Sequence, residues 1–244
     1  ISDPEFADWS AMTDAQRDTE DLRMATYAAM IDRLDQNIGR ILVKLDDLGD
    51  REKTIVLFAS DNGGSSEVVQ RGDGPIGSMT RWASLKADWA NVSNTPFRKY
   101  KNYSMEGGIA TPLIVSWPNH IARPGGYEKT PGHFIDIMAT FTDLARADYP
   151  KVWKDQPVTP MQGVSLRPLL QGLPLPQRPP IYWHWRKGKA IRVGSWKLVS
   201  HGGPWELYDL EADRTERQDL SASYPGVTAH LSGKWEAWSK EVER

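Results

Sequence analysis

The residues best suited to chemistry begin with a short polar segment near the first quarter of the chain. Asp61 and Asn62 follow an apolar run and precede Gly63 and Gly64. A carboxylate and an amide oxygen are ligands that a hard cation such as calcium prefers. The same Asp-Asn-Gly sequence is also ordinary turn chemistry, because Asn and Gly adopt the left-handed conformation at little cost. Two ligands alone do not make a site, so spacing leaves both interpretations open.

A second polar segment, residues 96–108, combines basic side chains with a Glu-Gly-Gly turn. It reads Pro-Phe-Arg-Lys-Tyr-Lys-Asn-Tyr-Ser-Met-Glu-Gly-Gly. One interpretation is a solvated loop rich in lysine. The other is that one ammonium group points at an anionic oxygen beside the metal, where it offsets charge that develops in a transfer reaction.

The elements that must position these segments follow from hydrophobic periodicity. Apolar residues recur at helical spacing over residues 19–48, which predicts a long amphipathic helix that ends at Gly49. Residues 54–59 form an unbroken apolar run typical of a buried strand, and residues 111–117 predict a second strand. A helix followed by a buried strand favours an α/β fold with parallel strands, which binds ligands at the carboxyl ends of the strands.

The rest of the chain predicts a loop, a helix and a connector. Residues 65–100 show little periodicity and predict a long loop with one short helix, and residues 133–147 predict a helix. Prolines cluster over residues 149–180, which indicates an extended connector between domains.

The last part of the chain predicts a small α+β unit. Its elements are three short strands and a closing helix, at residues 181–185, 189–199, 205–210 and about 227–241. We therefore expect three parts: an α/β part over 7–150, a proline-rich connector over 151–180, and a domain with an antiparallel sheet and a helix over 181–244.

Composition argues against several functions. Thirty Lys and Arg stand against 32 Asp and Glu, a formal net charge of -2, so nucleic acid is not an expected partner. No apolar stretch approaches the ~20 residues that span a bilayer, and no signal pattern is present on this chain. The compartment is therefore unknown, and a periplasmic or secreted location stays open for a longer protein. Without cysteine there is no disulfide and no thiolate metal site. Residues 1–6 are compatible with vector-derived sequence.

The order and spacing of these motifs closely resemble the bacterial arylsulfatases of the type I sulfatase family. The resemblance extends over nearly the whole chain after residue 7 and is carried by residues 27–39, 58–63, 101–112, 190–199 and 205–210. It implies the fold of the alkaline-phosphatase-like superfamily: part of a mixed sheet flanked by helices, followed by a small α+β domain with an antiparallel sheet.

The resemblance also assigns roles to residues. It places the family's second pair of calcium ligands on Asp61 and Asn62, and its sulfate-binding lysine on Lys101, with Lys99 as the less suitable position. In the family, a Cys or Ser oxidised to formylglycine forms a hydrated aldehyde whose oxygen attacks sulfur. Calcium and basic side chains neutralise the sulfate, and a histidine often protonates the leaving group.

His184 is the histidine that we expect to reach the pocket. It lies on the first predicted strand of the tail, where the family often has a histidine near the active site. The following residues, 185–190, depart from the Gly-Asn-Arg-Ala-like turn of the family, so a plain strand position is the alternative. His133 is expected to pack at a helix start, and the other three histidines receive no role: His120, His201 and His230.

The family's nucleophile motif, Cys or Ser followed by x-Pro-x-Arg, is absent from the chain. Residues 116–120 begin correctly but end in His, and residues 94–98 end in Arg but begin with Asn. Asp46 and Asp47 imitate the family's first metal-ligand pair, but they end a predicted helix and are interpreted as surface acids. We therefore expect part of a calcium-dependent sulfuric ester hydrolase that is inactive by itself, with aryl and carbohydrate sulfate esters both open as substrates.

Two alternatives remain. A phosphomonoester or phosphonate hydrolase of the same superfamily shares the fold and a bound metal, although the tail motif and the position of Lys101 favour a sulfatase. A non-catalytic module that associates with itself is the other alternative, because an incomplete sheet exposes an edge and apolar surface.

Overall fold

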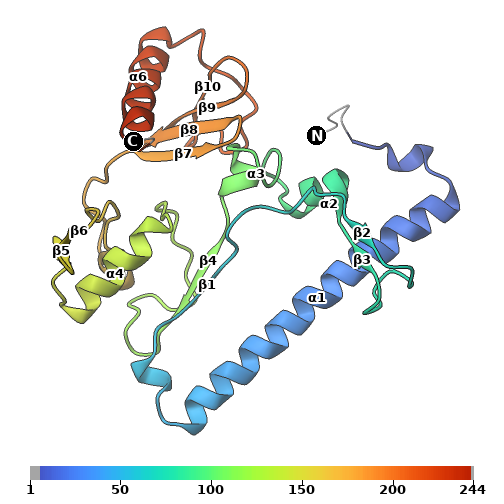
Figure 1. Ribbon diagram of the computed structural model, residues 1–244, viewed down its shortest axis with the longest axis horizontal. Helices are drawn as coiled ribbons and strands as arrows, with labels where there is room; N and C mark the ends of the chain where they lie inside the picture. The colour runs from blue at the N-terminus through green and yellow to red at the C-terminus, as the bar shows by residue number, and fades with distance from the viewer. Residues whose placement is uncertain (1–5, 243–244) are drawn as a thin grey trace. The chain divides into compact units, whose positions relative to one another are not determined.

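The computed structural model describes residues 6–242, a mixture of helices and small sheets (Figure 1). Five of the six residues compatible with a vector origin lie outside the described range. The chain forms two compact units. The first contains the residues up to Lys44, Phe58–Ile114 and the residues from Tyr182 onward, and the second contains Leu45–Leu57 and Val115–Ile181. The units interleave along the sequence, and the expected domain boundaries near 150 and 180 stay predictions.

The long predicted helix is α1, Asp14–Asp47, which follows a short 3-10 turn at Trp9–Ala11. Its predicted end is confirmed, because Gly49 has a φ of 68° and its N–H donates to the carbonyl of Asp46 at 3.0 Å. No helix within residues 6–242 combines the length and hydrophobicity that crossing a bilayer requires.

A largely buried charged cluster attaches α1 to Lys86, the first residue of the next helix. Arg23 is only 5% exposed, and its Nε lies 3.0 Å from Glu20. Glu20 also pairs with Lys86 at 2.7 Å, which lowers the pKa of the Glu20 carboxyl although burial opposes that shift. These paired charges therefore fix the first half of α1 to Lys86.

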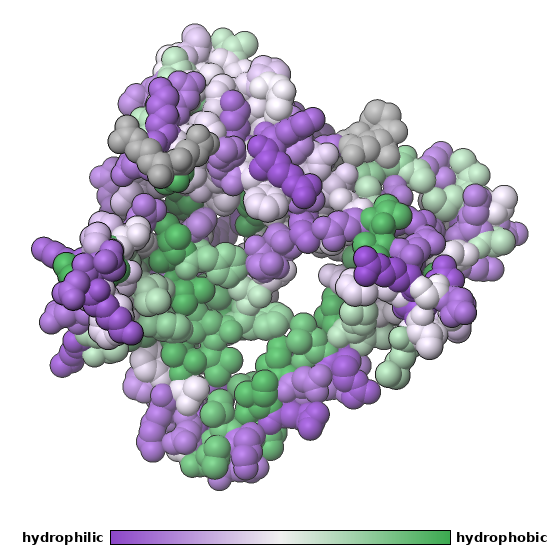
Figure 2. Space-filling model, in the orientation of Figure 1, coloured by the Kyte–Doolittle hydropathy of each residue, from purple (hydrophilic) through white to green (hydrophobic). Residues whose placement is uncertain are grey.

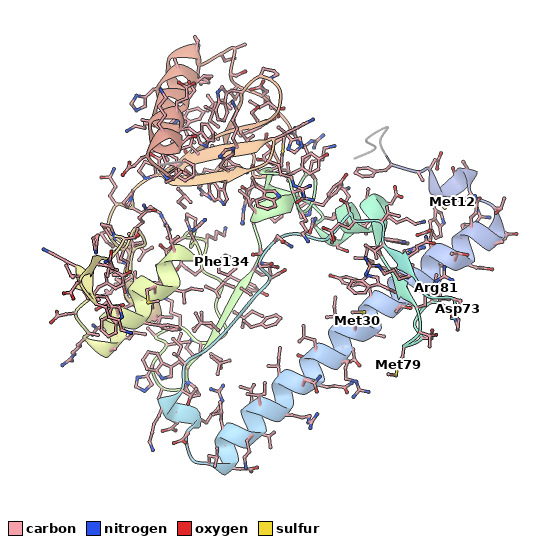
Figure 3. The ribbon with its side chains drawn as sticks, in the orientation of Figure 1. Met12, Met30, Asp73, Met79, Arg81 and Phe134 are labelled. Carbon is pink, nitrogen blue, oxygen red and sulfur yellow. The ribbon has the colours of Figure 1, made fainter. Side chains whose placement is uncertain are left out.

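The apolar stripe of α1 is exposed along its middle. Met30 is 65% and Ile41 is 59% exposed, and Figure 3 shows the side chain of Met30 projecting from the helix. Apolar surface runs along one side of α1 in Figure 2. The helix prediction is confirmed, but the described residues leave its apolar stripe largely uncovered.

The two predicted strands before residue 120 are β1, Val56–Ala59, and β4, Leu113–Ser116, which pair as a two-stranded sheet. The expected burial of the first strand is wrong for the described chain, because Phe58 is 39% exposed. A strand is buried on both faces only where other elements cover the sheet. Ile114 on β4 is 59% exposed, and apolar surface gathers over both strands in Figure 2.

The long loop between these strands contains more regular structure than expected. It holds the antiparallel pair β2, Gln70–Arg71, and β3, Trp82–Ala83, followed by α2, Lys86–Ser93. A short helix, α3, Glu106–Ile109, begins inside the second polar segment, at the predicted Glu-Gly-Gly turn.

The second unit contains the predicted helix 133–147 as α4, Ile135–Ala145. Its remaining elements are short: a 3-10 turn at Arg51–Lys53, the pair β5, Val152–Trp153, and β6, Gln156–Pro157, and α5, Arg167–Leu170. The fully buried Asp136 of α4 lies 3.0 Å from Arg178 and accepts the N–H of Val164 at 2.9 Å. One carboxylate therefore fixes the middle and the C-terminal end of the proline-rich connector to this helix.

The tail forms a four-stranded sheet with one helix, in the strand order β10-β9-β8-β7. Its elements are β7, Ile181–Trp185, β8, Gly188–Val193, β9, Trp196–His201, β10, Glu206–Asp209, and α6, Pro225–Val242. The single strand predicted at 189–199 is wrong, because Gly194, with a φ of 61°, turns the chain between two antiparallel strands. Apolar residues continue on both sides of that turn, so hydrophobic periodicity does not indicate where the first strand ends.

The two faces of this sheet are buried differently. One face packs Ile191, Leu198 and Leu207 against Leu231 and Trp235 of α6. Since neighbouring residues of a strand point to opposite faces, the other face carries the residues between them.

That other face buries a charged group. Lys197 is fully buried, and its Nζ lies 2.8 Å from Glu106 and 2.7 Å from Glu216. Glu216 also accepts the backbone N–H of Glu106 at 2.8 Å. Burial raises the pKa of the Glu216 carboxyl above its usual value, although Lys197 opposes the shift. The ammonium group therefore joins α3 to β9 and to the segment after β10.

Replacing Lys197 with Met should lower the free energy of unfolding by about 3–5 kcal/mol, because two buried carboxyl groups would lose their cation. Urea unfolding followed by tryptophan fluorescence measures this. Lys234→Met, at an exposed position of α6, is the control and should change stability by no more than about 0.5 kcal/mol. Equal stabilities of the two variants would contradict the role of the buried ammonium group.

Candidate active site

The predicted metal ligands lie in the turn directly after β1. The hydroxyl of Ser60 donates to the carbonyl of Asn62 at 2.7 Å, and the Asn62 Nδ2 donates to the carbonyl of Gly63 at 3.0 Å. This leaves the amide oxygen of Asn62 open, and the exposed carboxylate of Asp61 has no hydrogen bond or ion pair within residues 6–242. Such oxygen atoms fit the ligand preference of calcium.

The pair would fill only part of a calcium coordination sphere. Calcium takes six to eight oxygen ligands, and carboxylates usually supply several of them. Within the described residues, no group of three or more His, Cys, Asp or Glu side chains gathers closely enough to hold a metal ion. Asp61 and Asn62 therefore fit calcium only together with further ligands.

The turn packs backbone to backbone against the second polar segment, residues 96–108, which we call the lysine segment. The Gly63 N–H donates to the carbonyl of Gly108 at 3.0 Å, and the Lys101 N–H donates to the carbonyl of Gly64 at 3.0 Å. A Cβ added to Gly63 would lie 1.8 Å from the carbonyl oxygen of Gly107, so a side chain cannot fit there. These contacts bring the two segments that the sequence singled out side by side.

Asn94 adds a side-chain bridge that the sequence analysis did not predict. Its Oδ1 accepts the N–H of Gly64 at 3.0 Å, and its Nδ2 donates to the carbonyl of Lys99 at 3.1 Å. Lys99 and Asn102 have φ values of 66° and 78°, so left-handed residues stand on both sides of Lys101. That conformation is unfavourable for a residue with a side chain and is typical of functional sites. The Asn94 bridge stabilises it.

Lys101 lines a cavity. Its Nζ lies 3.3 Å from the carboxylate of Glu67, which is itself exposed. The cavity has a volume of about 350 Å³ and its lining consists of Ser66, Tyr100, Lys101, Asn102, Tyr103, Arg186, Lys187 and His201. Loop residues and the tail sheet thus share one pocket, within a single unit of the structure.

The tail sheet is fixed to the lysine segment by two direct contacts. The ring of Tyr103 stacks on that of His201, with 4.2 Å between centroids. The Trp185 Nε1 donates to the Asn102 Oδ1 at 3.0 Å. The wall of the cavity that comes from the tail is therefore held beside Lys101.

The histidine that lines the cavity is not the predicted one. His184 lies exposed on β7, with its ring edge-on to Trp235 of α6 at 5.2 Å between centroids, and its predicted role stays a prediction. His201, which received no role, lines the pocket. Burial, followed by the charges of Lys187 and Lys99, lowers the pKa of His201 from its usual value. The only signal in the sequence for His201 as a pocket residue is its position near the end of a tail strand.

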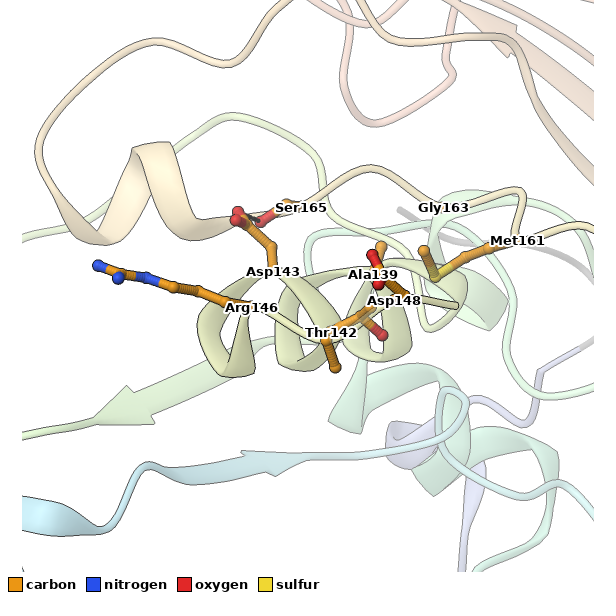
Figure 4. Close-up of a pocket in the computed structure, with 9 residues that line it drawn as sticks. Ala139, Thr142, Asp143, Arg146, Asp148, Met161, Gly163 and Ser165 are labelled. Carbon is orange, nitrogen blue, oxygen red and sulfur yellow. Dashed lines mark hydrogen bonds between the residues drawn. The ribbon is translucent and has the colours of Figure 1, made fainter. Parts of the chain in front are cut away.

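A second pocket, of about 560 Å³, lies in the other unit beside α4 (Figure 4). Asp143 there accepts a hydrogen bond from Ser165 at 2.6 Å and pairs with Arg167 at 3.0 Å. These partners lower the pKa of the Asp143 carboxyl. Its lining includes none of the predicted site residues, and we assign it no part in the chemistry.

Replacing Gly63 with Ala should displace the turn from the lysine segment and lower the free energy of unfolding by about 1–3 kcal/mol, because the new Cβ would overlap a backbone carbonyl. Chemical denaturation measures the loss. Gly233→Ala is the matched control: a Cβ added there in α6 would meet nothing within 4 Å beyond the helix's own backbone, so alanine should stabilise the helix by about 0.5–1 kcal/mol. A neutral effect of Gly63→Ala would refute the close packing of the two segments.

Comparisons with known proteins identify the family of the chain. A profile of the family described as Sulfatase matches residues 3–147, and one described as N-sulphoglucosamine sulphohydrolase, C-terminal, matches residues 97–240. A sulfatase of Schizosaccharomyces pombe is 28% identical, with 96% of this chain and 46% of that protein covered. An arylsulfatase of Klebsiella aerogenes is 32% identical, with 65% of this chain and 37% of that protein covered.

A solved structure shows the same architecture. The crystal structure of Ps i-CgsB has a TM-score of 0.67 and 26% identity, with 87% of this chain and 42% of that one covered. The chain thus spans less than half the length of these relatives. The predicted fold class, part of an alkaline-phosphatase-like mixed α/β fold followed by a small antiparallel sheet and helix, is confirmed. With one family profile covering the turn after β1 and Lys101, and a second covering the tail, the chain belongs to the sulfatase family.

Proposed function

We propose that this chain supplies the second calcium-ligand pair and the sulfate-binding lysine of a sulfuric ester hydrolase. The observation that supports this most strongly is the backbone contact that places the turn of Asp61 and Asn62 against the segment of Lys101. A carboxylate, an amide oxygen and an ammonium group then project from neighbouring segments of one unit. Membership of the sulfatase family supports the same reaction.

The residues of this chain would act by holding charge in place. Asp61 and Asn62 would hold calcium, which supplies positive charge beside the sulfate when bound. Lys101 would donate a charge-assisted hydrogen bond to a sulfate oxygen. Its present partner, Glu67, is 55% exposed in its side chain, and such pairs contribute only about 0–1 kcal/mol. A sulfate can therefore replace Glu67 at small cost.

The attacking group of the proposed reaction lies outside these 244 residues, since no Cys or Ser stands in the required motif. A formylglycine on another segment would supply it. Among the relatives, one is an arylsulfatase and another, from Mus musculus, is an N-acetylgalactosamine-6-sulfatase of 29% identity. Both aryl and carbohydrate sulfate esters are therefore candidate substrates.

The test uses 4-nitrophenyl sulfate with the 244-residue chain and with a longer protein that contains the family's nucleophile motif ahead of it. The longer protein should hydrolyse the ester, lose activity with a calcium chelator and regain it with calcium, whereas the chain alone should be inactive. Lys101→Ala in the longer protein should lower kcat/KM about 100-fold or more, because a group that stabilises developing charge is removed. Asp61→Asn should raise the calcium concentration needed for activity.

Lys44→Ala, at an exposed position of α1, is the control and should keep full activity. Full activity of Lys101→Ala would overturn the assignment of the lysine. Faster hydrolysis of 4-nitrophenyl phosphate than of the sulfate would favour the alternative, a phosphomonoester or phosphonate hydrolase.

We also propose that the 244-residue chain associates with itself through the sheet of β1 and β4. Phe58 and Ile114 expose apolar surface there, and the edges of a two-stranded sheet have unpaired backbone groups. The expected partner is a second copy.

Light scattering should show a mass that rises above 27.5 kDa with concentration. Ile114→Lys should restore the monomer, because it places a charge in the apolar contact. Met79→Lys, at another exposed apolar position (Figure 3), should leave association unchanged. A monomer at every concentration would rule out this association.

A further inference from the structure

The pocket around Lys101 contains two more cations that the proposed chemistry does not use. Arg186 and Lys187 lie in the turn between β7 and β8 and line the same cavity. Both side chains are exposed. Such residues usually belong to a solvated turn. Their position relative to Lys101 therefore decides whether they can take part in binding.

The turn is held in place on both sides. Before it, the Trp185 indole donates to Asn102, the residue after Lys101, at 3.0 Å. After it, Gly188 lies so close to the lysine segment that an added Cβ would be 2.9 Å from the hydroxyl of Ser104. Arg186 and Lys187 therefore cannot move far from Lys101 without breaking these contacts.

The two side chains are also partly ordered. The Arg186 guanidinium lies 5.6 Å from the centre of the Trp185 ring, and a Cβ on Gly202 would lie 3.3 Å from the Cδ of Lys187, so the lysine stem passes close to the backbone of the next hairpin. Stems that are already restrained lose less conformational freedom when their heads bind an anion.

The charge of the pocket exceeds what one sulfate ester needs. Its lining contains three cations, Lys101, Arg186 and Lys187, and no carboxylate, while Glu67 pairs with Lys101 from outside the lining. A sulfate ester carries one negative charge, which Lys101 and calcium would already offset. The volume of about 350 Å³ is within the range of small-molecule sites, about 300–1,000 Å³.

We propose that Arg186 and Lys187 bind a second sulfate group of the substrate, so that the site selects a polysulfated saccharide over a monosulfated compound. The planar guanidinium of Arg186 suits the oxygen atoms of a sulfate, and Lys187 adds a point charge. The inference rests on the proposed sulfate-binding role of Lys101. The selectivity of the site then comes from the turn of Arg186 and Lys187, where this chain departs from the family's sequence.

The test compares two probes, D-glucosamine 2-N,6-O-disulfate and D-glucosamine 6-O-sulfate, in NMR titrations of the 244-residue chain with calcium at low salt. The chain should bind the disulfate at least ~10-fold more tightly, which corresponds to about 1.4 kcal/mol. Arg186→Gln with Lys187→Gln should reduce the ratio of affinities to nearly 1 and leave the affinity for the monosulfate unchanged. Lys234→Gln with Lys240→Gln, exposed on α6, removes the same charge and should keep the ratio.

The outcomes separate this inference from the proposed function. A ratio near 1 in the original chain, with Lys101→Ala weakening both probes, overturns the inference alone. A ratio that persists in the Arg186 and Lys187 variant, whose unliganded spectrum reports its fold, also overturns it. If Lys101→Ala weakens neither probe, or neither probe binds, the inference and the proposed role of Lys101 both fail.

Discussion

The buried ammonium group of Lys197 holds together the parts of the first unit that build the pocket. It lies between the carboxylates of Glu106 and Glu216, and Glu106 begins α3 inside the lysine segment. Upstream of Lys101, Arg98 donates to the Glu216 carbonyl at 3.1 Å. A buried charge is tolerated only when it is paired and hydrogen-bonded. The lysine segment is therefore stable only where it meets the tail sheet in this register, and the unfavourable backbone around Lys101 is stabilised from both sides.

Hydrophobic periodicity predicted most helices and strands, but it missed a turn between two strands and did not predict what covers them. The long helix, the helix in the second unit and the closing helix were predicted because their apolar spacing is local information. The turn at Gly194 was missed, because strands on both sides of a hairpin have the same alternation. The burial of β1 was overestimated, since a run of apolar residues shows that a strand can be buried and not what covers it.

The candidate site also combines residues that local sequence indicates with residues that only the folded chain brings together. Asp61 and Asn62 were singled out from a short motif and Lys101 from the family resemblance, and the structure places their segments in contact. Glu67 and Asn94 could not be predicted, because their roles depend on how a loop of low periodicity folds back on itself. The same holds for the tail residues of the pocket, which meet Lys101 only after about 80 further residues of chain have formed a sheet. Such long-range contacts leave no regular pattern in a single sequence.

The contact between Gly63 and Gly107 determines how this pocket can diversify in evolution. A Cβ on Gly63 would overlap the Gly107 carbonyl, and a Cβ on Gly107 would overlap the carbonyls of Arg98 and Lys99, so neither position accepts a side chain. The turn at Arg186 and Lys187 has no such constraint, since both side chains are exposed. Descendants of this sequence can therefore change the side chains of this turn one substitution at a time, whereas the two glycine positions tolerate no such change.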